Sequence, residues 1–499
     1  MPIETERKYT LDQSEDLVGE DLHLELTEPW CWGEQRSFRL VADYVDTPDM
    51  TLMQAGYTLR RRTGGADEGW HLKCPRAGDS RVEVHAGLAA GRSAARVPHE
   101  LRARLDEVVG LDVLVPVAEL VTHREERAIL REGSGVVVVL LADDRVVARG
   151  GAGGALVGWR EVEVELVDGT PDDLDAIEQV LLAQRLSRSS AGPKLAHALG
   201  MLGGDTAWAA ARGGPTGAEV VLAHLRRQVG AMQGWEPKTR SDEPDAVHKH
   251  RVACRRLRST LRSFRGLFDR SVTDPIRDEV RWLGEQLGAP RDAEVVSARI
   301  LADLAELEAD EVVGDVRDRL PAALEHTHAE AHAALVVALD SERHDALMEA
   351  LVGLLLDPPL RPERAHQSAK KVRKRVSKTV TRRVERAREA ALAGSGDQPR
   401  WELLHEVRKK AKAARYAHEV FDDQAEVTSR WEAVTETLGE VQDCTVTAAR
   451  LRELADQATD AGQPTGTYEV LEHRQLARGR EALAEAEDAL RAVSDSGRT

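Results

Sequence analysis

Two short segments, one near the start and one toward the end of the first 200 residues, carry charged side chains at every second position. Glu4–Lys8 has acid, acid and base at its alternate positions, and Glu161–Glu165 has three glutamates in the same spacing. In a β-strand, residues two apart point to the same face, so each segment would present its charges on one face. Carboxylates gathered on one face repel each other unless a cation binds them, and oxygen ligands of this kind suit Mg²⁺ or Mn²⁺. The spacing therefore indicates a divalent metal site.

Basic side chains alternate in the same way along three further segments, Arg60–Arg62, His71–Lys73 and Arg81–His85. Arginine and lysine gathered on one face suit phosphate oxygens. For any single strand, a salt-bridged solvent face explains the alternation equally well. A closed barrel would instead bring these charges together inside it. A carboxylate–metal side facing a cationic side could then neutralise a polyphosphate and activate water.

The elements that would position these residues follow from the hydropathy pattern. Alternating or apolar runs separated by Gly, Pro and Asp clusters predict an antiparallel sheet or barrel. The runs are Ile3–Leu11, Ser37–Asp46, Tyr57–Arg62, Gly69–Cys74, Arg81–His85, Leu120–Leu130, Val136–Asp144 and Leu156–Val167. Helices are expected at Pro98–Val109 and Pro171–Leu186. The second follows a Thr170 cap and begins with proline.

The second half of the chain has helical periodicity and an internal repeat. A Gly- and Ala-rich segment at 203–217 is interpreted as a linker that follows a first domain at 1–202. Residues 218–499 have apolar residues at three- and four-residue spacing, which is typical of a helical bundle. Two similar halves, about 218–355 and 365–499, contain matching histidine, basic and Leu-Gly positions. The fold class is therefore predicted as multidomain α+β, with a duplicated all-α bundle after the sheet.

A stripe of basic residues follows one helix face in each repeat, because the residues are three or four apart. The stripes are His248, Arg251, Arg255, Arg258, Arg262 and Arg265 in the first repeat and His405, Arg408, Lys412 and Arg415 in the second, and the basic segment between them adds Lys370, Lys374 and Lys378. Like charges at this spacing destabilise a helix by roughly a few tenths of a kcal/mol per pair, so a bound anion would favour the stripes. A solvated basic face is the alternative interpretation.

The first 200 residues resemble the CYTH domain family, the triphosphate tunnel metalloenzymes. Ile3–Lys8 matches the ExExK signature, and further matches follow in the family's order. They are Leu59–Arg62, Leu72–Lys73, Glu83, Thr122–Arg124, Asp144, Glu161–Glu165 and Lys194. The resemblance implies an eight-stranded antiparallel β-barrel with a polar tunnel, in which triphosphates undergo two-metal hydrolysis.

The resemblance also implies roles for the matching residues. Metal would be held by Glu4, Glu6, Glu163 and Glu165, with Glu161 and Asp144 as support. Triphosphate would be bound by Lys8, Arg60, Arg62, Lys73, Arg124 and Lys194, and Glu83 belongs to the same site. Two registers stay open here, because Asp143 could replace Asp144 and Arg127 could replace Arg124.

Residues 218–499 resemble the CHAD domain, a histidine-bearing α-helical domain often found after CYTH. The matching segments are Val247–Phe264 and Leu404–Phe421, together with the two Leu-Gly segments. The resemblance implies that inorganic polyphosphate binds a basic surface between the two halves. Glu419 stands where the first repeat has Arg262, so weaker binding is expected in the second half.

Composition limits other function classes. The net charge is −17 and aromatic residues make up 4%, which disfavours a nucleic-acid partner despite the basic stripes. No apolar run is long enough to span a membrane, the N-terminus has no apolar signal region, and the four cysteines are far apart. We therefore expect a cytoplasmic protein with no membrane partner, and polyphosphate granules as a further expected location.

Taken together, these patterns predict an enzyme, a Mg²⁺- or Mn²⁺-dependent triphosphatase acting on inorganic triphosphate or a related triphosphate. Its helical domain would bind polyphosphate. Alternatives in the same fold are an adenylyl cyclase, a thiamine triphosphatase or a nucleoside triphosphatase. A non-catalytic polyphosphate-binding scaffold is the alternative from another class, and no oligomeric state is favoured.

Overall fold

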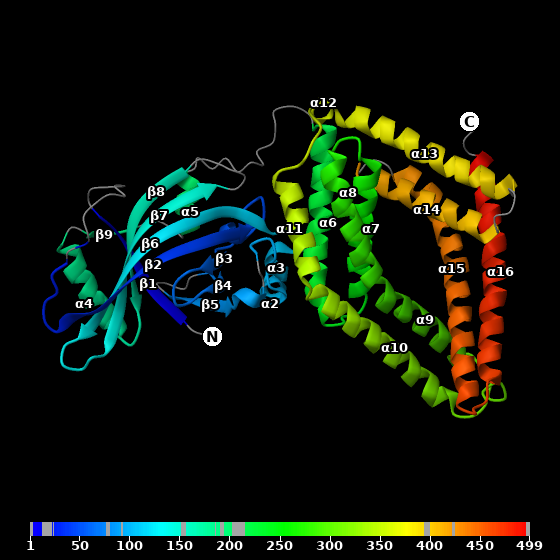
Figure 1. Ribbon diagram of the computed structural model, residues 1–499, viewed down its shortest axis with the longest axis horizontal. Coiled ribbons are helices and arrows are strands. Elements are labelled where there is room, and N and C mark those ends of the chain that lie inside the picture. Colours follow the sequence, from blue (N-terminus) through cyan, green and yellow to red (C-terminus); the bar gives the residue numbers. More distant parts are fainter. Residues whose placement is uncertain are drawn as a thin grey trace. The chain divides into compact units, whose positions relative to one another are not determined.

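A computed structural model describes residues 3–11, 22, 24–75, 80–90, 93–150, 156–184, 186–189, 194–201, 215–393, 400–421 and 425–495 of the chain (Figure 1). Backbone contacts divide the chain into two compact units. The first comprises Met1–Arg212 with Met348–Asp357, and the second comprises Gly213–Leu347 with Pro358–Thr499. Most of the predicted linker, 202–214, lies outside the described residues.

Within its described residues, the first unit forms an antiparallel sheet of nine strands (Figure 1). The strands are β1 (Ile3–Leu11), β2 (Trp30–Asp46), β3 (Thr58–Thr63), β4 (Gly69–Lys73), β5 (Ser80–Ala86), β6 (Val115–Arg131), β7 (Val137–Gly150), β8 (Leu156–Leu166) and β9 (Leu186–Arg188). The predicted antiparallel sheet is confirmed. The count differs from the eight predicted strands because the short β9 pairs with the end of β1.

The strand order is β5-β4-β3-β2-β6-β7-β8-β1-β9, and β1 makes a further pairing with β5. Glu6–Tyr9 of β1 pair with β8, whereas Ile3–Thr5 pair with β5. The first and last strands of the order are therefore both hydrogen-bonded to the N-terminal segment. The CYTH resemblance implies a closed eight-stranded barrel. The pairing of β1 with β5 is one that such a closure would require.

One face of the sheet is apolar and covered by helices. Val162 and Val164 of β8 are fully buried with Leu174, Ile177 and Leu181 of α4 (Pro171–Leu182), which lies against the strands in Figure 1. Thr170 caps α4 through a capping box with Asp173, as the sequence predicts. At the β3–β4 end, a second core forms against α1 (Thr51–Gln54), α2 (His99–Arg104) and α3 (Asp106–Val109). The opposite face is left to the charged residues.

Helix boundaries differ in detail from the predicted ones. The helix expected at Pro98–Val109 is two short helices, α2 and α3, that meet at the buried Leu105. The helix expected to reach Leu186 ends at Leu182, because Leu186 belongs to β9. A further helix, α5 (Lys194–Met201), begins at one of the predicted site residues.

The second unit is helical, as predicted (Figure 1). Its helices, with α11 shared between the two units, are α6 (Gly217–Arg240), α7 (Ala246–Ser263), α8 (Arg270–Gln286), α9 (Gly288–Ala305), α10 (Val316–Leu339), α11 (Glu342–Leu356), α12 (Pro362–Ala365), α13 (Ala369–Ala393), α14 (Arg400–Glu419), α15 (Ala425–Asp460) and α16 (Gly466–Asp495). None of the helices in the described ranges has the length and apolar character that a membrane crossing requires.

The two predicted repeats meet at α7 and α14. The rings of Phe264 and Phe421, which occupy matching positions, are 5.9 Å apart between centroids. The repeats also differ, because the first Leu-Gly segment separates α8 from α9, whereas Leu438-Gly439 lies inside the continuous α15. Each of the two glycines lies close to the guanidinium group of an arginine from its own repeat. A Cβ would come within 3.6 Å of Arg251 Nη2 at Gly288 and within 3.1 Å of Arg408 Nη2 at Gly439.

Candidate functional sites

Three buried carboxylates on β7 and β8 form what we term the carboxylate cluster: Asp144, Glu161 and Glu163. Asp144 pairs with Glu161 across the two strands, and Glu163 lies two residues further along the same face. Their oxygen atoms lie within 4.8 Å of one another. The indole of Trp159 donates a hydrogen bond of 2.8 Å to Glu161 Oε2, which fixes the orientation of that carboxylate.

Three cations are bound to the carboxylate cluster. Lys194 Nζ lies 3.0, 2.7 and 2.6 Å from oxygens of the three carboxylates in the order given above. Lys8, which pairs with Glu163 across β1 and β8, places its Nζ 2.5 Å from that carboxylate. Arg124 donates to Asp144 at 2.7 and 2.8 Å and to Glu163 at 2.7 Å. Each charge of the cluster therefore has a partner of opposite sign.

These contacts favour the ionised form of Glu163 and Asp144 despite their burial. Burial alone would raise the pKa of Glu163, but Lys194, Lys8 and Arg124 outweigh it and hold that pKa well below the usual range. For Lys194, burial would lower the pKa, but Glu161, Glu163 and Asp144 raise it well above its usual value. A group of charged, buried, all-oxygen ligands is the chemistry that Mg²⁺ and Mn²⁺ prefer, so the residues fit a divalent ion.

A second set of charged residues comes from β3, β4 and β5. Arg60 and Arg62 lie on β3, and within the described part of the chain their buried Nε atoms have no hydrogen-bond partner. Lys73 Nζ lies 3.6 Å from Glu83 on the neighbouring strand. Burial, followed by repulsion from Arg60 and Arg124, lowers the pKa of Arg62 to about 10. Crowded buried cations of this kind are relieved by an anion.

Members of both sets line one cavity of about 290 Å³, to which the carboxylate cluster contributes Glu163, whereas Asp144 and Glu161 are absent from the lining. Its charged lining comprises Glu6, Lys8, Arg36, Arg60, Arg62, Asp67, Lys73, Arg81, Glu83, Arg124, Glu126, Glu163, Glu165 and Lys194. Glu6 also receives a contact of 2.6 Å from Arg81 Nη2. The cavity thus has acidic groups next to the carboxylate cluster and guanidinium and ammonium groups on the β3–β5 side.

The structure distinguishes the two open registers. Asp144 joins the cluster, whereas Asp143 points to the other face and accepts two hydrogen bonds from Arg160. Arg124 lines the cavity, whereas Arg127 lies 4.3 Å from the centroid of the Trp32 ring. Strand parity explains both outcomes, because the paired strands bring Arg124 directly opposite Asp144.

Other predicted residues of this site have different surroundings. Glu165 lines the cavity but is exposed and lies outside the three-residue cluster. Glu4 lies on β1 opposite Arg81, and its side chain is outside the described residues. Sequence reasoning left Arg81 out of the site, although its alternation with Glu83 was the available signal. It gave no signal for Arg36 and Glu126, which line the same cavity.

In the second unit, α7, α8 and α14 surround a strongly basic cavity of about 670 Å³. Its charged lining comprises Arg255, Arg258, Arg262, Arg265, Arg277, Arg281, Lys409, Lys410 and Lys412, with Asp278 and Glu406 as the acids. A further cavity of about 450 Å³ shares Arg255 and Arg258 and adds Arg251. The two helices with predicted stripes therefore face a common space, which we term the basic cavity.

The remaining predicted residues of the helical unit do not line these cavities. His248 and His405 are partly buried, and burial, followed by neighbouring cations, lowers the pKa of each ring. Arg408 and Arg415 have buried Nε atoms without a hydrogen-bond partner among the described residues. The exposed lysines of α13, namely Lys370, Lys374 and Lys378, are absent from the linings of both cavities.

One lysine of the basic cavity, Lys412, is buried close to several other cations. Burial, followed by the charges of Arg408, Arg255 and Arg415, lowers the pKa of Lys412 to about 7. Arg255 also has a buried Nε without a partner within the described ranges. The cations of the helix stripes thus repel one another, and a bound polyanion would reduce this repulsion.

Comparisons with known proteins match two family models to successive parts of the chain. A family model described as CYTH domain matches residues 2–198, and one described as CHAD domain matches residues 223–452. The uncharacterized protein Rv2226 of Mycobacterium tuberculosis is 34% identical over 477 residues, which cover 92% of this chain and 91% of the relative.

Solved structures that resemble parts of the chain include a CHAD domain and the protein HpAC1. The CHAD domain from the plant Ricinus communis is 25% identical, with a TM-score of 0.45, and the match covers 57% of this chain and 93% of that one. HpAC1 from Hippeastrum, whose description reports a dominant triphosphatase activity, is 16% identical, with a TM-score of 0.26 and coverage of 40% and 96%. The chain therefore belongs to the family of proteins in which a CYTH domain is followed by a CHAD domain.

Proposed function

We propose that the first unit hydrolyses inorganic triphosphate or a related triphosphate with the help of a divalent metal ion. The observation that carries this proposal is one cavity lined both by Glu163 of the carboxylate cluster and by Arg60 and Arg62, whose buried Nε atoms have no hydrogen-bond partner among the described residues. Membership of the CYTH family, a family of triphosphatases and cyclases, supports it. We also propose that the pairing of β1 with β5 closes the sheet into a tunnel around this cavity.

The residues suggest a division of labour in the cavity. Asp144, Glu161 and Glu163 would hold the metal, with Glu6 beside them, and Mg²⁺ or Mn²⁺ bound there would neutralise phosphate charge and polarise a phosphoryl oxygen. Arg60, Arg62 and Lys73 would bind and orient the phosphate chain. The charged hydrogen bonds that they offer also stabilise negative charge on the leaving group. Lys8, Lys194 and Arg124 would keep the carboxylates ionised and aligned.

We propose that the second unit binds inorganic polyphosphate in the basic cavity. Nine basic residues and two acids line it, and the lowered pKa of Lys412 indicates uncompensated positive potential. Binding of this kind would also bring the protein to polyphosphate granules. The basic cavity lies within one unit, so the proposal does not depend on the position of the CYTH unit.

A substrate panel tests the proposed hydrolysis. Purified full-length protein should release phosphate from tripolyphosphate with Mg²⁺ or Mn²⁺, and a chelator should abolish the release because the carboxylates alone cannot polarise the phosphoryl group. ATP and thiamine triphosphate serve as competing substrates, with cyclic AMP formation measured in parallel. Turnover of ATP to cyclic AMP would favour the cyclase alternative, and no turnover of any substrate would favour the scaffold.

Polyphosphate binding should weaken as the pH rises from about 6 to 8, because Lys412 loses its proton near pH 7 and must regain it to bind an anion. The expected change is at most about tenfold per pH unit, as for a single linked proton. Isothermal titration with a defined polyphosphate at several pH values measures it. In a Lys412→Arg variant, which keeps the charge throughout this range, the decline should disappear. A decline of equal size in that variant would assign the titration to another group.

A further inference from the structure

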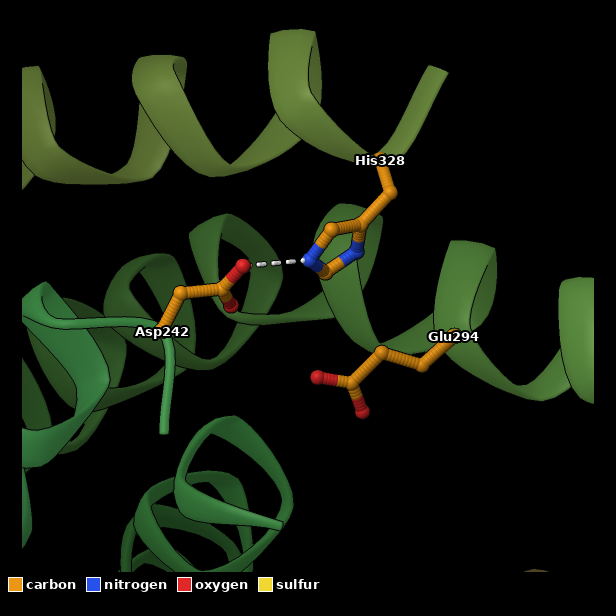
Figure 2. Close-up of side chains that lie close together, drawn as sticks. All are labelled: Asp242, Glu294 and His328. Carbon is orange, nitrogen blue, oxygen red and sulfur yellow. Dashed lines mark hydrogen bonds and ion pairs between the residues drawn. The ribbon is translucent and has the colours of Figure 1, made fainter. Parts of the chain in front are cut away.

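A turn in the helical unit brings an acid against a histidine of a distant helix. Asp242 lies between α6 and α7 with a left-handed backbone φ of 52°. His328 lies on α10, and its Nε2 is 2.9 Å from Asp242 Oδ2 (Figure 2). A non-glycine residue in the left-handed region is uncommon, so the backbone at this turn is unusual.

A second acid from a third element completes the group. Glu294 of α9 points its carboxylate toward the other two side chains in Figure 2, and one ligand atom from each of the three residues lies within 4.8 Å of the others. Arg291 Nη1 contacts Glu294 Oε2 at 2.8 Å, one turn earlier on the same helix. The group is open to solvent on one side, because the side chain of Asp242 is 40% exposed.

A second histidine supports the same group independently. His332 follows His328 by four residues, so both rings lie on one face of α10 and stack with centroids 6.2 Å apart. His332 Nε2 donates to the carbonyl oxygen of Thr239 at 2.7 Å and lies 3.8 Å from Asp242 Oδ1. Among the described residues, the buried Nδ1 of His328 has no hydrogen-bond partner. The hydrogen bond of the His328 ring to Asp242 is made at Nε2, and the buried Nδ1 is left without a partner among those residues.

We propose that Asp242, Glu294 and His328 form a binding site for a divalent transition-metal ion of the Zn²⁺ class. Histidine nitrogen combined with two carboxylates suits such ions, whereas the all-oxygen carboxylate cluster of the first unit suits Mg²⁺ or Mn²⁺. Three protein ligands leave the fourth position to water on the exposed side. His332 acts as a positioning residue, because it stacks on His328 and lies beside Asp242. The ion would tie the α6–α7 turn to α9 and α10.

Zinc titration of the full-length protein tests the site. With excess Mg²⁺ present to occupy all-oxygen sites, calorimetry should show one equivalent of Zn²⁺ bound by the unaltered protein. Zinc should also raise its melting temperature. Asp242→Asn and His328→Ala should each lose this equivalent and the thermal shift. His332→Ala should keep the equivalent with an affinity roughly 10- to 100-fold weaker, as for other residues that orient metal ligands.

His326→Ala is the matched control, because His326 lies on the same helix but is largely exposed and pairs with Glu330. It should bind zinc as the unaltered protein does. Circular dichroism verifies that each variant is folded, and Glu294→Gln offers a second, isosteric test if the alanine variant unfolds. Equal zinc binding by the unaltered protein, Asp242→Asn and His328→Ala would overturn the proposal, as would no zinc binding by the unaltered protein. The three side chains would then form only an ion-paired contact.

Discussion

Replacing Glu163 with glutamine is expected to abolish metal-dependent hydrolysis of tripolyphosphate. Glu163 is the member of the carboxylate cluster that contacts Lys8, Arg124 and Lys194 together. The amide keeps the shape of the side chain but removes one negative ligand from the proposed metal site. Loss of several kcal/mol of charge stabilisation corresponds to a fall in kcat/KM of at least about 100-fold.

Glu125→Gln is the control for this experiment. Glu125 follows Arg124 on β6 but points to the other face, where it accepts hydrogen bonds from Gln35 and Ser37. It should retain full activity. Removing Glu163 also leaves buried cations short of one partner, so the melting temperature of the variant must be measured beside its activity. A folded Glu163→Gln protein with unaltered turnover would contradict the assignment of the cavity.

Reversing two charges in the basic cavity, by Arg255→Glu and Arg258→Glu together, is expected to abolish long-chain polyphosphate binding. Both arginines line both cavities of the helical unit, and burial, followed by repulsion from Arg281 and Arg262, lowers the pKa of Arg258. Hydrogen bonds to charged groups contribute about 1.5–3 kcal/mol each, so affinity should fall by at least about 100-fold. The salt dependence should become shallower, because fewer counterions are released.

A double variant at exposed basic positions provides the control. Lys249 lies on the same helix as the two arginines but its side chain is 50% exposed, and Arg480 is exposed on α16. Lys249→Glu with Arg480→Glu changes the net charge equally and should leave most of the affinity intact. Tripolyphosphate hydrolysis should survive in both double variants. Equal weakening by the two would mean that polyphosphate responds only to total charge.

The sequence predicts which charged side chains share a strand face, because strand parity is a strict rule. Alternation alone places Glu161 and Glu163 on one face, and the burial of Val162 and Val164 on the other face agrees with it. What alternation does not provide is the partner strand. Whether Asp143 or Asp144 joins the cluster depends on the β7–β8 register. The register is set by pairing between distant segments, and no local sequence pattern predicts it.

For the basic cavity, the density of basic residues along the sequence does not predict which of them line it. The most basic segment of the chain is α13, and its buried face is formed by Val372, Val376 and Val380. Lys374 and Lys378 are offset by two residues from these valines and therefore point outward. Arg277 and Arg281 of α8 line the cavity instead, because α8 packs beside α7. No stripe in the sequence marks them, since helix packing rather than periodicity brings them there.

The position of β1 has a consequence for the order in which the protein matures. Glu6 and Lys8 precede the other residues of the site in the sequence and are synthesised before them, yet the strand that holds them pairs with β5, β8 and β9. Pairings of such long sequence separation are slow to form, because the intervening chain must be ordered first. On the ribosome, the N-terminal strand must wait until the segment ending with Lys194 has emerged. A chain that stalls before β8 therefore carries Lys8 without its partner Glu163, and the site is complete only when the whole unit has been synthesised.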